Sequence, residues 1–311
     1  MEHYVTLFDA LFLPQGLALH ASLQRHAGTY TLWILCLDEQ AHSVLSELQL
    51  PNMRLLRAAD VETAELLAVK PTRTRGEYCW TLTPFTPRFV FDAAADVRRV
   101  TYLDADLWFR ANPASIFREF EASGKEVLIT DHAYAPEYDQ TATSGRYCVQ
   151  FLTVTRDGGE VVRKWWEERC IEWCYARVEN GKFGDQKYLD DWPERFGQWV
   201  HVLADKELAQ APWNATRFPY GSSVFYHFHG LRIISASRIA LSNYVLPEPV
   251  KTHVYQPYLR DLRAVLRVLA DHGSPLQPQA RPPGIARRLI RILAGIRRLA
   301  RAQLPPEITR W

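Results

Sequence analysis

Short apolar segments that alternate with helical patterns restrict the fold of this chain most strongly. Residues 31–37 form an almost continuous apolar run, which is typical of a strand buried on both faces of a parallel sheet. We expect further strands at 4–8 and 53–56, with helices at 16–23 and 39–48 between them. This strand–helix alternation predicts a doubly wound α/β sheet.

The pattern continues along the chain. Strands are expected at 126–130 and 147–155, and helices at 77–92 and 161–178. Two prolines, Pro84 and Pro87, must start the helix at 77–92 late or kink it.

Acidic residues directly follow three of the expected strands. Asp9 and Asp38 follow the first two strands, and Asp104 follows a strand at 100–103. Ligands of doubly wound sheets bind beyond the carboxyl ends of the strands, so the sequence predicts a site there.

The pair Asp104 and Asp106 is the strongest chemical signal in the sequence. Residues two apart at an extended strand end point to the same side, so both carboxylates can converge. Two close carboxylates repel unless a cation lies between them, and a hard divalent cation that also binds phosphate meets that need. Taken alone, Asp-x-Asp is more often part of a solvated loop after a strand than of a metal site.

Charge is distributed unevenly along the chain. Residues 281–311 carry eight Arg and one Glu, which is +7, whereas the first 280 residues carry −5. Within residues 284–304 the aliphatic residues recur at helical spacing and the arginines largely fill the other faces. This pattern predicts an interfacial helix attracted to an anionic membrane surface. A helix docked on the domain is the alternative, and nucleic acid, the third reading, is not expected as a partner.

Composition divides the chain into three parts. We expect a domain at 1–270, a Pro-rich linker at 271–284 with four Pro and two Gly, and a basic amphipathic tail at 285–311. The five cysteines have no paired spacing, which favours reduced thiols in a cytoplasmic protein. With no leader pattern and no apolar run of membrane-spanning length, we expect a peripheral location on the inner face of the cytoplasmic membrane.

Three more motifs follow the Asp-x-Asp pair in order. They are Phe183-Gly-Asp185-Gln186, Pro212-Trp-Asn214 and His227-Phe-His-Gly230. With Tyr102-Leu-Asp104-Ala-Asp106, they resemble the metal-dependent nucleotide-diphospho-sugar glycosyltransferases over roughly residues 3–235. The resemblance is greatest to the family of the bacterial lipopolysaccharide galactosyl- and glucosyltransferases and glycogenin. It implies a glycosyltransferase A-type (Rossmann-like) mixed sheet flanked by helices, to which the sequence adds a C-terminal amphipathic helix.

The resemblance also implies roles for individual residues. Asp104, Asp106 and His227 would hold the metal, with His229 as the alternative to His227. Mn²⁺ suits two carboxylates and an imidazole better than Mg²⁺, which stays the second choice. Asp185 and Gln186 are the candidate catalytic residues. The candidate donor-binding residues are Thr6, Asp9, Arg75, Ala105, Asp131, Gly230 and Arg232. Of these, Asp9 would accept the uracil N–H, unless it is a helix N-cap.

The implied activity is transfer of a hexose from a UDP-sugar to a glycan or lipid-linked acceptor, with retention, in cell-surface polysaccharide or lipopolysaccharide synthesis. Two departures limit what the resemblance implies. Cys148-Val-Gln150 stands where the family has Asn-Ala-Gly, so the donor sugar is not implied, and Arg232 is the cation nearest to the family's missing lysine. A metal-dependent phosphohydrolase and an inactive sugar-nucleotide-binding domain are the alternatives.

Overall fold

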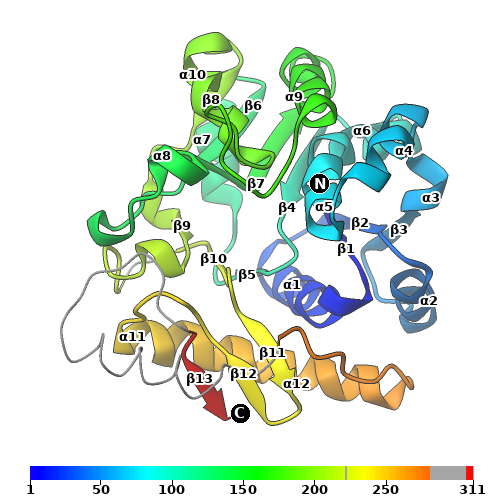
Figure 1. Cartoon of the computed structure of the whole chain (residues 1–311), viewed down its shortest axis with the longest axis vertical. Helices are drawn as coiled ribbons and strands as arrows, with labels where there is room; N and C mark the ends of the chain where they lie inside the picture. Colours follow the sequence, from blue (N-terminus) through cyan, green and yellow to red (C-terminus); the bar gives the residue numbers. More distant parts are fainter. Residues whose placement is uncertain (221–222, 281–305, 311) are drawn as a thin grey trace.

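A seven-stranded mixed sheet lies at the centre of the computed structural model, which describes residues 1–220, 223–280 and 306–310 (Figure 1). The strand order is β3-β2-β1-β4-β7-β6-β8. Four parallel strands come first, namely β3 (Met53–Arg57), β2 (Tyr30–Cys36), β1 (Glu2–Phe8) and β4 (Arg99–Leu103). β7 (Tyr147–Thr155) is antiparallel to both β4 and β6 (Val127–Asp131), and β6 pairs in parallel with β8 (Val200–Val202). The predicted Rossmann-like mixed sheet is confirmed.

Helices cover both faces of this sheet. α1 (Leu13–His26), α2 (Glu39–Leu48) and α7 (Ala114–Ser123) share one apolar cluster with Tyr4 and Phe8 of β1. α4 (Ala64–Val69), α5 (Arg75–Leu82), α6 (Thr86–Ala93) and α9 (Glu160–Glu172) share the other cluster with Val5 and Leu7. Successive side chains of a strand point to opposite faces, so β1, which is buried continuously from Tyr4 to Phe8, serves both clusters. The shorter helices are α3 (Ala58–Val61), α8 (Thr141–Ser144), α10 (Trp192–Arg195) and α11 (Glu248–Val250).

Two predicted helices differ from the structure. The helix expected at 77–92 is divided into α5, a 3-10 turn at Thr83–Phe85 and α6, because Pro84 and Pro87 each lie in the first turn of a new segment and lack a backbone N–H. The helix expected at 161–178 ends at Glu172. Its next residue, Trp173, has extended backbone, and the Trp173 carbonyl accepts a hydrogen bond from the Tyr188 hydroxyl at 2.8 Å.

Two small sheets complete the fold. In the first, β10 (Phe225–His227) lies between β5 (Leu107–Phe109) and β9 (Ala209–Gln210). In the second, β12 (Arg238–Ala240) lies between β11 (Arg232–Ser235) and β13 (Ile308–Arg310). α12 (Gln256–Asp271) contacts α1, and Figure 1 shows the C-terminal elements below the large sheet.

The described C-terminal residues are held against the domain. The Gln279 side chain donates to the Leu11 carbonyl at 2.8 Å and accepts from the Ile233 N–H at 3.0 Å. β13 pairs with β12 along three residues. Most of the predicted tail helix lies outside the described residues, so the helix and the three-part division stay predictions. No helix among the described residues has the length and apolar character needed to cross a bilayer.

α1 approaches β1 closely at Gly16. A Cβ atom added to Gly16 would lie 2.3 Å from the Cε1 atom of Phe8, whose ring is buried. Phe8 is the last residue of β1 and precedes Asp9, so this contact supports the sheet edge at which the candidate site lies.

We expect Gly16→Ala to lower the free energy of unfolding by about 1–3 kcal/mol, because the added methyl must displace the Phe8 ring. Urea unfolding would measure the change. Gly76→Ala in α5 is the matched control, since no heavy atom lies within 4 Å of its added Cβ. That change should be neutral or stabilising by up to about 1 kcal/mol. A Gly16→Ala protein as stable as the wild type would contradict the close approach.

Candidate functional site

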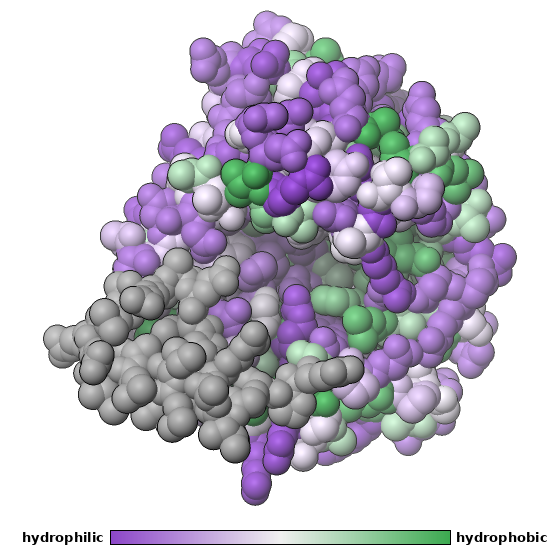
Figure 2. Space-filling view, viewed as in Figure 1, coloured by the Kyte–Doolittle hydropathy of each residue, from purple (hydrophilic) through white to green (hydrophobic). Residues whose placement is uncertain are grey.

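A cavity of about 640 Å³ lies at one edge of the large sheet. β1, β2, β4 and β6 all end at this edge, since β7 is antiparallel to both of its neighbours. Figure 2 shows a hollow in the middle of the molecule, below a rim of mainly hydrophilic residues. A cavity of this size is typical of sites that take a cofactor or another small molecule. It lies at the edge where the sequence predicts a site.

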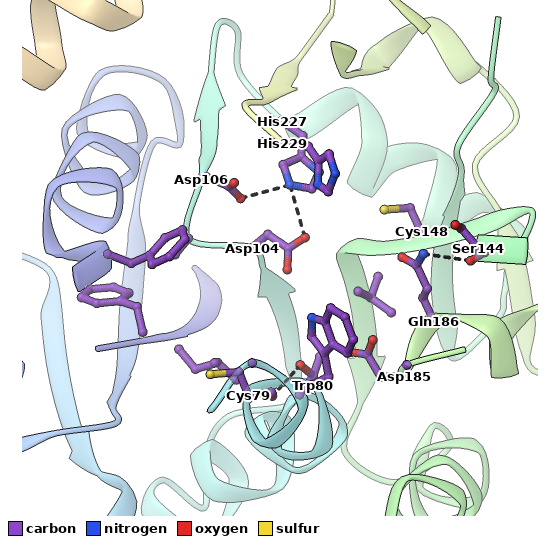
Figure 3. A pocket seen from close by; sticks show the side chains of 18 of the residues that line it. Cys79, Trp80, Asp104, Asp106, Ser144, Cys148, Asp185, Gln186, His227 and His229 are labelled. Carbon is purple, nitrogen blue, oxygen red and sulfur yellow. Dashed lines mark hydrogen bonds and ion pairs between the residues drawn. The ribbon is translucent and has the colours of Figure 1, made fainter. Parts of the chain in front are cut away.

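Asp104, Asp106 and His227 meet inside the cavity (Figure 3). The His227 Nε2 atom lies 3.0 Å from Asp106 Oδ1 and 3.6 Å from Asp104 Oδ2. Each of the three residues offers one ligand atom, and these atoms all lie within 4.8 Å of one another. Two carboxylates and one imidazole form a donor set that fits a divalent cation such as Mn²⁺.

The small sheet β5-β10-β9 brings His227 to the two carboxylates. In the antiparallel pairing of β10 with β5, His227 lies opposite Leu107, the residue that follows Asp106. The Phe228 N–H donates to the Asp106 carbonyl at 2.9 Å, which holds the two segments in this register. His229 also lines the cavity. Among the described residues, however, the group of side chains placed to hold a metal ion consists of Asp104, Asp106 and His227, and we call it the metal-type cluster.

The charges of this cluster are mutually dependent. Burial raises the pKa of Asp104, while its Oδ1 atom accepts a hydrogen bond from the Tyr102 hydroxyl at 2.9 Å. Burial alone would also raise the pKa of Asp106, but the charge and hydrogen bond of His227 lower it to about 2. Burial opposes a charge on His227, yet Asp106 raises the His227 pKa above its usual value. Without a metal, the carboxylate of Asp106 therefore favours a proton, and with it a positive charge, on His227.

A third carboxyl group, that of Asp185, also lines the cavity. Burial, and then the charge of Asp104, raise the Asp185 pKa to about 7. Its Oδ2 atom is buried and has no hydrogen-bond partner among the described residues. Beside it, the Gln186 Nε2 donates to the Ser144 carbonyl at 2.8 Å, as Figure 3 shows. Asp185 therefore gains or loses its proton near neutral pH, whereas Gln186 is held in one orientation by the Ser144 carbonyl.

Asp9, which follows β1, lines the cavity together with Arg75, and Asp38, which follows β2, contacts Arg75. Arg75 forms ion pairs from its Nε atom to Asp9 Oδ2 at 2.6 Å and from its Nη2 atom to Asp38 Oδ2 at 2.7 Å. The Asp9 Oδ1 atom accepts from the N–H groups of Leu11 and Phe12, so Asp9 is the N-cap of a 3-10 turn (Ala10–Phe12). The alternative prediction that Asp9 is a helix N-cap is therefore confirmed, and Asp9 also lines the cavity.

Arg232 reaches the same cavity from β11. Its guanidinium lies over the Phe12 ring at 5.4 Å and contributes to the low pKa of Asp106. Ala105 lines the cavity between the two metal-type carboxylates.

Three of the predicted donor-binding residues are not among the described residues that line the cavity, namely Thr6, Asp131 and Gly230. Thr6 is fully buried in the middle of β1. Asp131 ends β6, but its Oδ2 atom pairs with Lys206 Nζ at 2.8 Å and with Arg146 Nε at 3.1 Å. Gly230 follows His229 at a positive φ of 78°, which a glycine adopts without strain.

Comparison with known proteins assigns the chain to a family. No protein-family model matches it. It is 31% identical to the uncharacterized protein YfnF of Bacillus subtilis (strain 168) over 296 residues, which covers 89% of this chain and 95% of YfnF. The chain belongs to the YfnF family. It is also 29% identical over 282 residues to the uncharacterized protein YfnD of the same organism, covering 84% of this chain and 88% of YfnD.

Solved structures with a similar chain trace are more distant. Mouse xyloside xylosyltransferase 1 has a TM-score of 0.49 at 16% identity, covering 74% of this chain and 98% of that protein. The glycosyltransferase GlyE of Streptococcus pneumoniae TIGR4 has a TM-score of 0.49 at 15% identity, covering 90% and 67%. An active-site mutant of LgtC has a TM-score of 0.48 at 14% identity, covering 73% and 87%. At such low similarity, the fold and site of this YfnF-family protein rest on its own strand order and contacts.

Sequence reasoning missed an aromatic wall on the β6 side of the cavity. His132 stacks on Tyr134 with ring centroids 4.6 Å apart, and Trp213 contacts both His132 and His227 at their ring edges. The Trp213 Nε1 donates to the His132 carbonyl at 2.9 Å. The available signal was the Pro212-Trp-Asn214 motif, which ties the end of β6 to the metal-type histidine in this YfnF-family protein.

We expect Asp185→Asn to remove a pH dependence of stability. Between about pH 4 and 7 the folded protein keeps the Asp185 proton that the unfolded chain has released. The free energy of unfolding of the metal-free protein therefore falls as pH rises through this window. The variant should be more stable than the wild type at pH 8, by on the order of a few kcal/mol, and similar near pH 4.

Thermal unfolding in the presence of a chelator at pH 4, 6 and 8 would measure this difference. Asp157→Asn, at an exposed position, is the control and should keep the wild-type pH profile. Parallel profiles for Asp185→Asn and the wild type would show that Asp185 is not a buried, protonated group.

Proposed function

We propose that this protein is a metal-dependent glycosyltransferase that moves a sugar from a UDP-sugar donor to a glycan or lipid-linked acceptor. One observation carries the proposal. The four motifs that resemble such enzymes lie far apart in the sequence, at 102–106, 183–186, 212–214 and 227–230, and each contributes side chains to the same cavity. Unrelated local patterns would have no reason to converge in this way.

Asp104, Asp106 and His227 would hold the metal ion, for which Mn²⁺ is the first choice and Mg²⁺ the second. When bound, a divalent cation there supplies Lewis-acid neutralisation of the diphosphate leaving group. His227 must release its Nε2 proton before it can act as a ligand, so metal binding should weaken at low pH.

The protein's own cations complete a site for the diphosphate. Arg232 and Arg75 line the cavity, and no lysine does so among the described residues. Arg232 faces Asp106 closely enough to lower its pKa, so a phosphate near the metal ligands would also meet this guanidinium. Asp9, which follows β1, would accept a hydrogen bond from the uracil N–H. Its carboxylate would then be shared between the uracil and the guanidinium of Arg75.

The reacting sugar would lie between the metal ligands and Asp185. With a pKa of about 7, Asp185 is protonated in a substantial fraction of molecules at neutral pH, and this form can donate a hydrogen bond to a sugar hydroxyl. Gln186, oriented by the Ser144 carbonyl, is a weak nucleophile at most. The resemblance of the four motifs implies retention and a hexose donor, so we favour a retaining transfer of the hexosyltransferase type.

A titration of UDP with and without Mn²⁺, followed by an assay of UDP-sugar hydrolysis, tests the proposal. A glycosyltransferase should bind UDP more tightly with Mn²⁺ and slowly release UDP and free sugar. A phosphohydrolase would instead release inorganic phosphate from small phosphoesters. An inactive binding domain would bind UDP and leave the UDP-sugar intact.

The metal site has its own test. Asp106→Asn removes one carboxylate charge from the cluster and should weaken Mn²⁺-dependent UDP binding by more than about 10- to 100-fold, the loss typical when only an outer partner of a metal ligand is changed. Isothermal titration with and without Mn²⁺ would measure it, and circular dichroism would check the fold. Asp157→Asn is the matched exposed control. Unchanged Mn²⁺ dependence in Asp106→Asn would rule out this cluster as the metal site.

We further propose that the protein is peripheral to the inner face of the cytoplasmic membrane and acts on a lipid-linked acceptor in cell-surface polysaccharide or lipopolysaccharide synthesis. The support is the sequence of residues 284–304, in which aliphatic residues recur at helical spacing among six arginines. Each arginine near an anionic surface contributes about 1 kcal/mol, and salt screens this attraction.

Replacing these six arginines with glutamine should abolish binding to phosphatidylglycerol vesicles while UDP binding is retained. The substitutions are Arg287, Arg288, Arg291, Arg297, Arg298 and Arg301 to Gln. Substitution is preferable to truncation because a truncation before residue 284 would also remove β13, which pairs with β12. Vesicle sedimentation at low and high salt would measure binding, with neutral phosphatidylcholine vesicles as the control. Equal sedimentation of both proteins would contradict the membrane proposal.

A further inference from the structure

We infer that Gln150 is a positioning residue of the metal site, since it holds two of the three ligands. Gln150 lies in β7 and is fully buried. Its Oε1 atom lies 2.8 Å from the Nδ1 atom of His227. Its backbone carbonyl accepts a hydrogen bond from the N–H of Asp104 at 3.0 Å. One residue of the large sheet therefore contacts a ligand that follows β4 and a ligand carried by β10.

The side-chain contact selects the tautomer of His227. The Nε2 atom faces the two carboxylates, so it is the atom that would bind a cation. Its lone pair must then be free, and the single hydrogen of the neutral imidazole must be on Nδ1. Nδ1–H needs an acceptor in this buried place, and Gln150 Oε1 supplies it. Partners of this kind commonly orient metal-bound histidines.

The nitrogen of the Gln150 side-chain amide also supports this role. Its Nε2 atom is buried without a hydrogen-bond partner among the described residues. Buried side-chain amides ordinarily form hydrogen bonds through both the oxygen and the nitrogen. Within the part of the chain that the structure describes, the Gln150 amide forms one only through its oxygen, so its burial costs stability that this single contact has to offset. The contact is with the histidine of the metal-type cluster. An amide also keeps its oxygen uncharged at every pH, and so adds no further charge beside Asp104 and Asp106.

The inference rests on the proposed metal site, and two substitutions of Gln150 test it. Gln150→Met keeps the length and apolar stem of the side chain but removes the acceptor. It should weaken Mn²⁺ binding about 10- to 100-fold. Gln150→Glu restores an oxygen acceptor and should bind Mn²⁺ within about threefold of the wild type, because carboxylate partners also orient metal-bound histidines.

The matched control is Gln210→Met. Gln210 is another buried glutamine whose Nε2 lacks a partner among the described residues, and it pairs with Tyr226, the neighbour of His227. This substitution should leave Mn²⁺ affinity unchanged. Titration followed by the EPR signal of free Mn²⁺ would measure all four proteins, and thermal unfolding would check their stability.

A second readout can be made on the wild-type protein first and then on the two Gln150 variants. In ¹⁵N-histidine-labelled protein saturated with diamagnetic Zn²⁺, the His227 resonance, assigned by its loss in His227→Asn, should show a hydrogen on Nδ1 and none on Nε2. The same state should persist in Gln150→Glu. In Gln150→Met the Nδ1–H signal should broaden or shift as the ring loses its acceptor.

The outcomes separate the inference from the proposed function. Wild-type Mn²⁺ affinity in Gln150→Met, or a His227 without hydrogen on Nδ1 in the Zn²⁺-bound wild type, would overturn the role of Gln150 alone. A wild-type protein that binds neither metal would overturn both the site and the inference. If Gln150→Met fails to fold, the ¹⁵N signature of the wild type still decides.

Discussion

The repulsion between Asp104 and Asp106 is the constraint on which the site depends. Two carboxylates in a buried place need a cation between or beside them. The structure meets this need with His227, whose Nε2 lies 3.0 Å from Asp106. The histidine comes from a strand that is not part of the large sheet, and so the small sheet β5-β10-β9 has to be placed with accuracy.

That placement depends on elements well beyond the cavity. Side chains alternate along β10 and its continuation, so His227 and His229 face the cavity while Phe228 faces the opposite side. Phe228 stacks on Tyr258 of α12 with ring centroids 3.6 Å apart. A slip of one residue would exchange these faces, placing Phe228 among the carboxylates. The apolar contact with α12 therefore helps to specify which residue meets Asp106, and α12 in this way supports the cluster of Asp104, Asp106 and His227.

The parts of this arrangement that the sequence predicts are the local ones. Apolar strands with an acid at the carboxyl end identify the sheet edge, and the spacing of Asp104 and Asp106 identifies the pair, because both signals lie within a few residues. His227 required the resemblance of its motif. Asp131 shows the limit of the strand-end argument, since it ends β6 at the same edge. Its carboxylate is held by Lys206 and Arg146, whose approach no local pattern predicts. Gln150 was noted only as a departure from the family, because a polar residue in an apolar strand does not reveal which side chain it will meet.

The titration of the cluster also follows from its geometry. The charge of Asp104 adds to burial in raising the Asp185 pKa to about 7, and Asp106 raises the pKa of His227. If a divalent charge offsets the two carboxylates, both effects weaken together. His227 then gives up its Nε2 proton, and Asp185 keeps only the part of its shift that burial causes. Ligation by Asp104, Asp106 and His227 is thus linked to proton release from two residues on different segments. The same carboxylates that would hold the ion therefore also influence the protonation of Asp185.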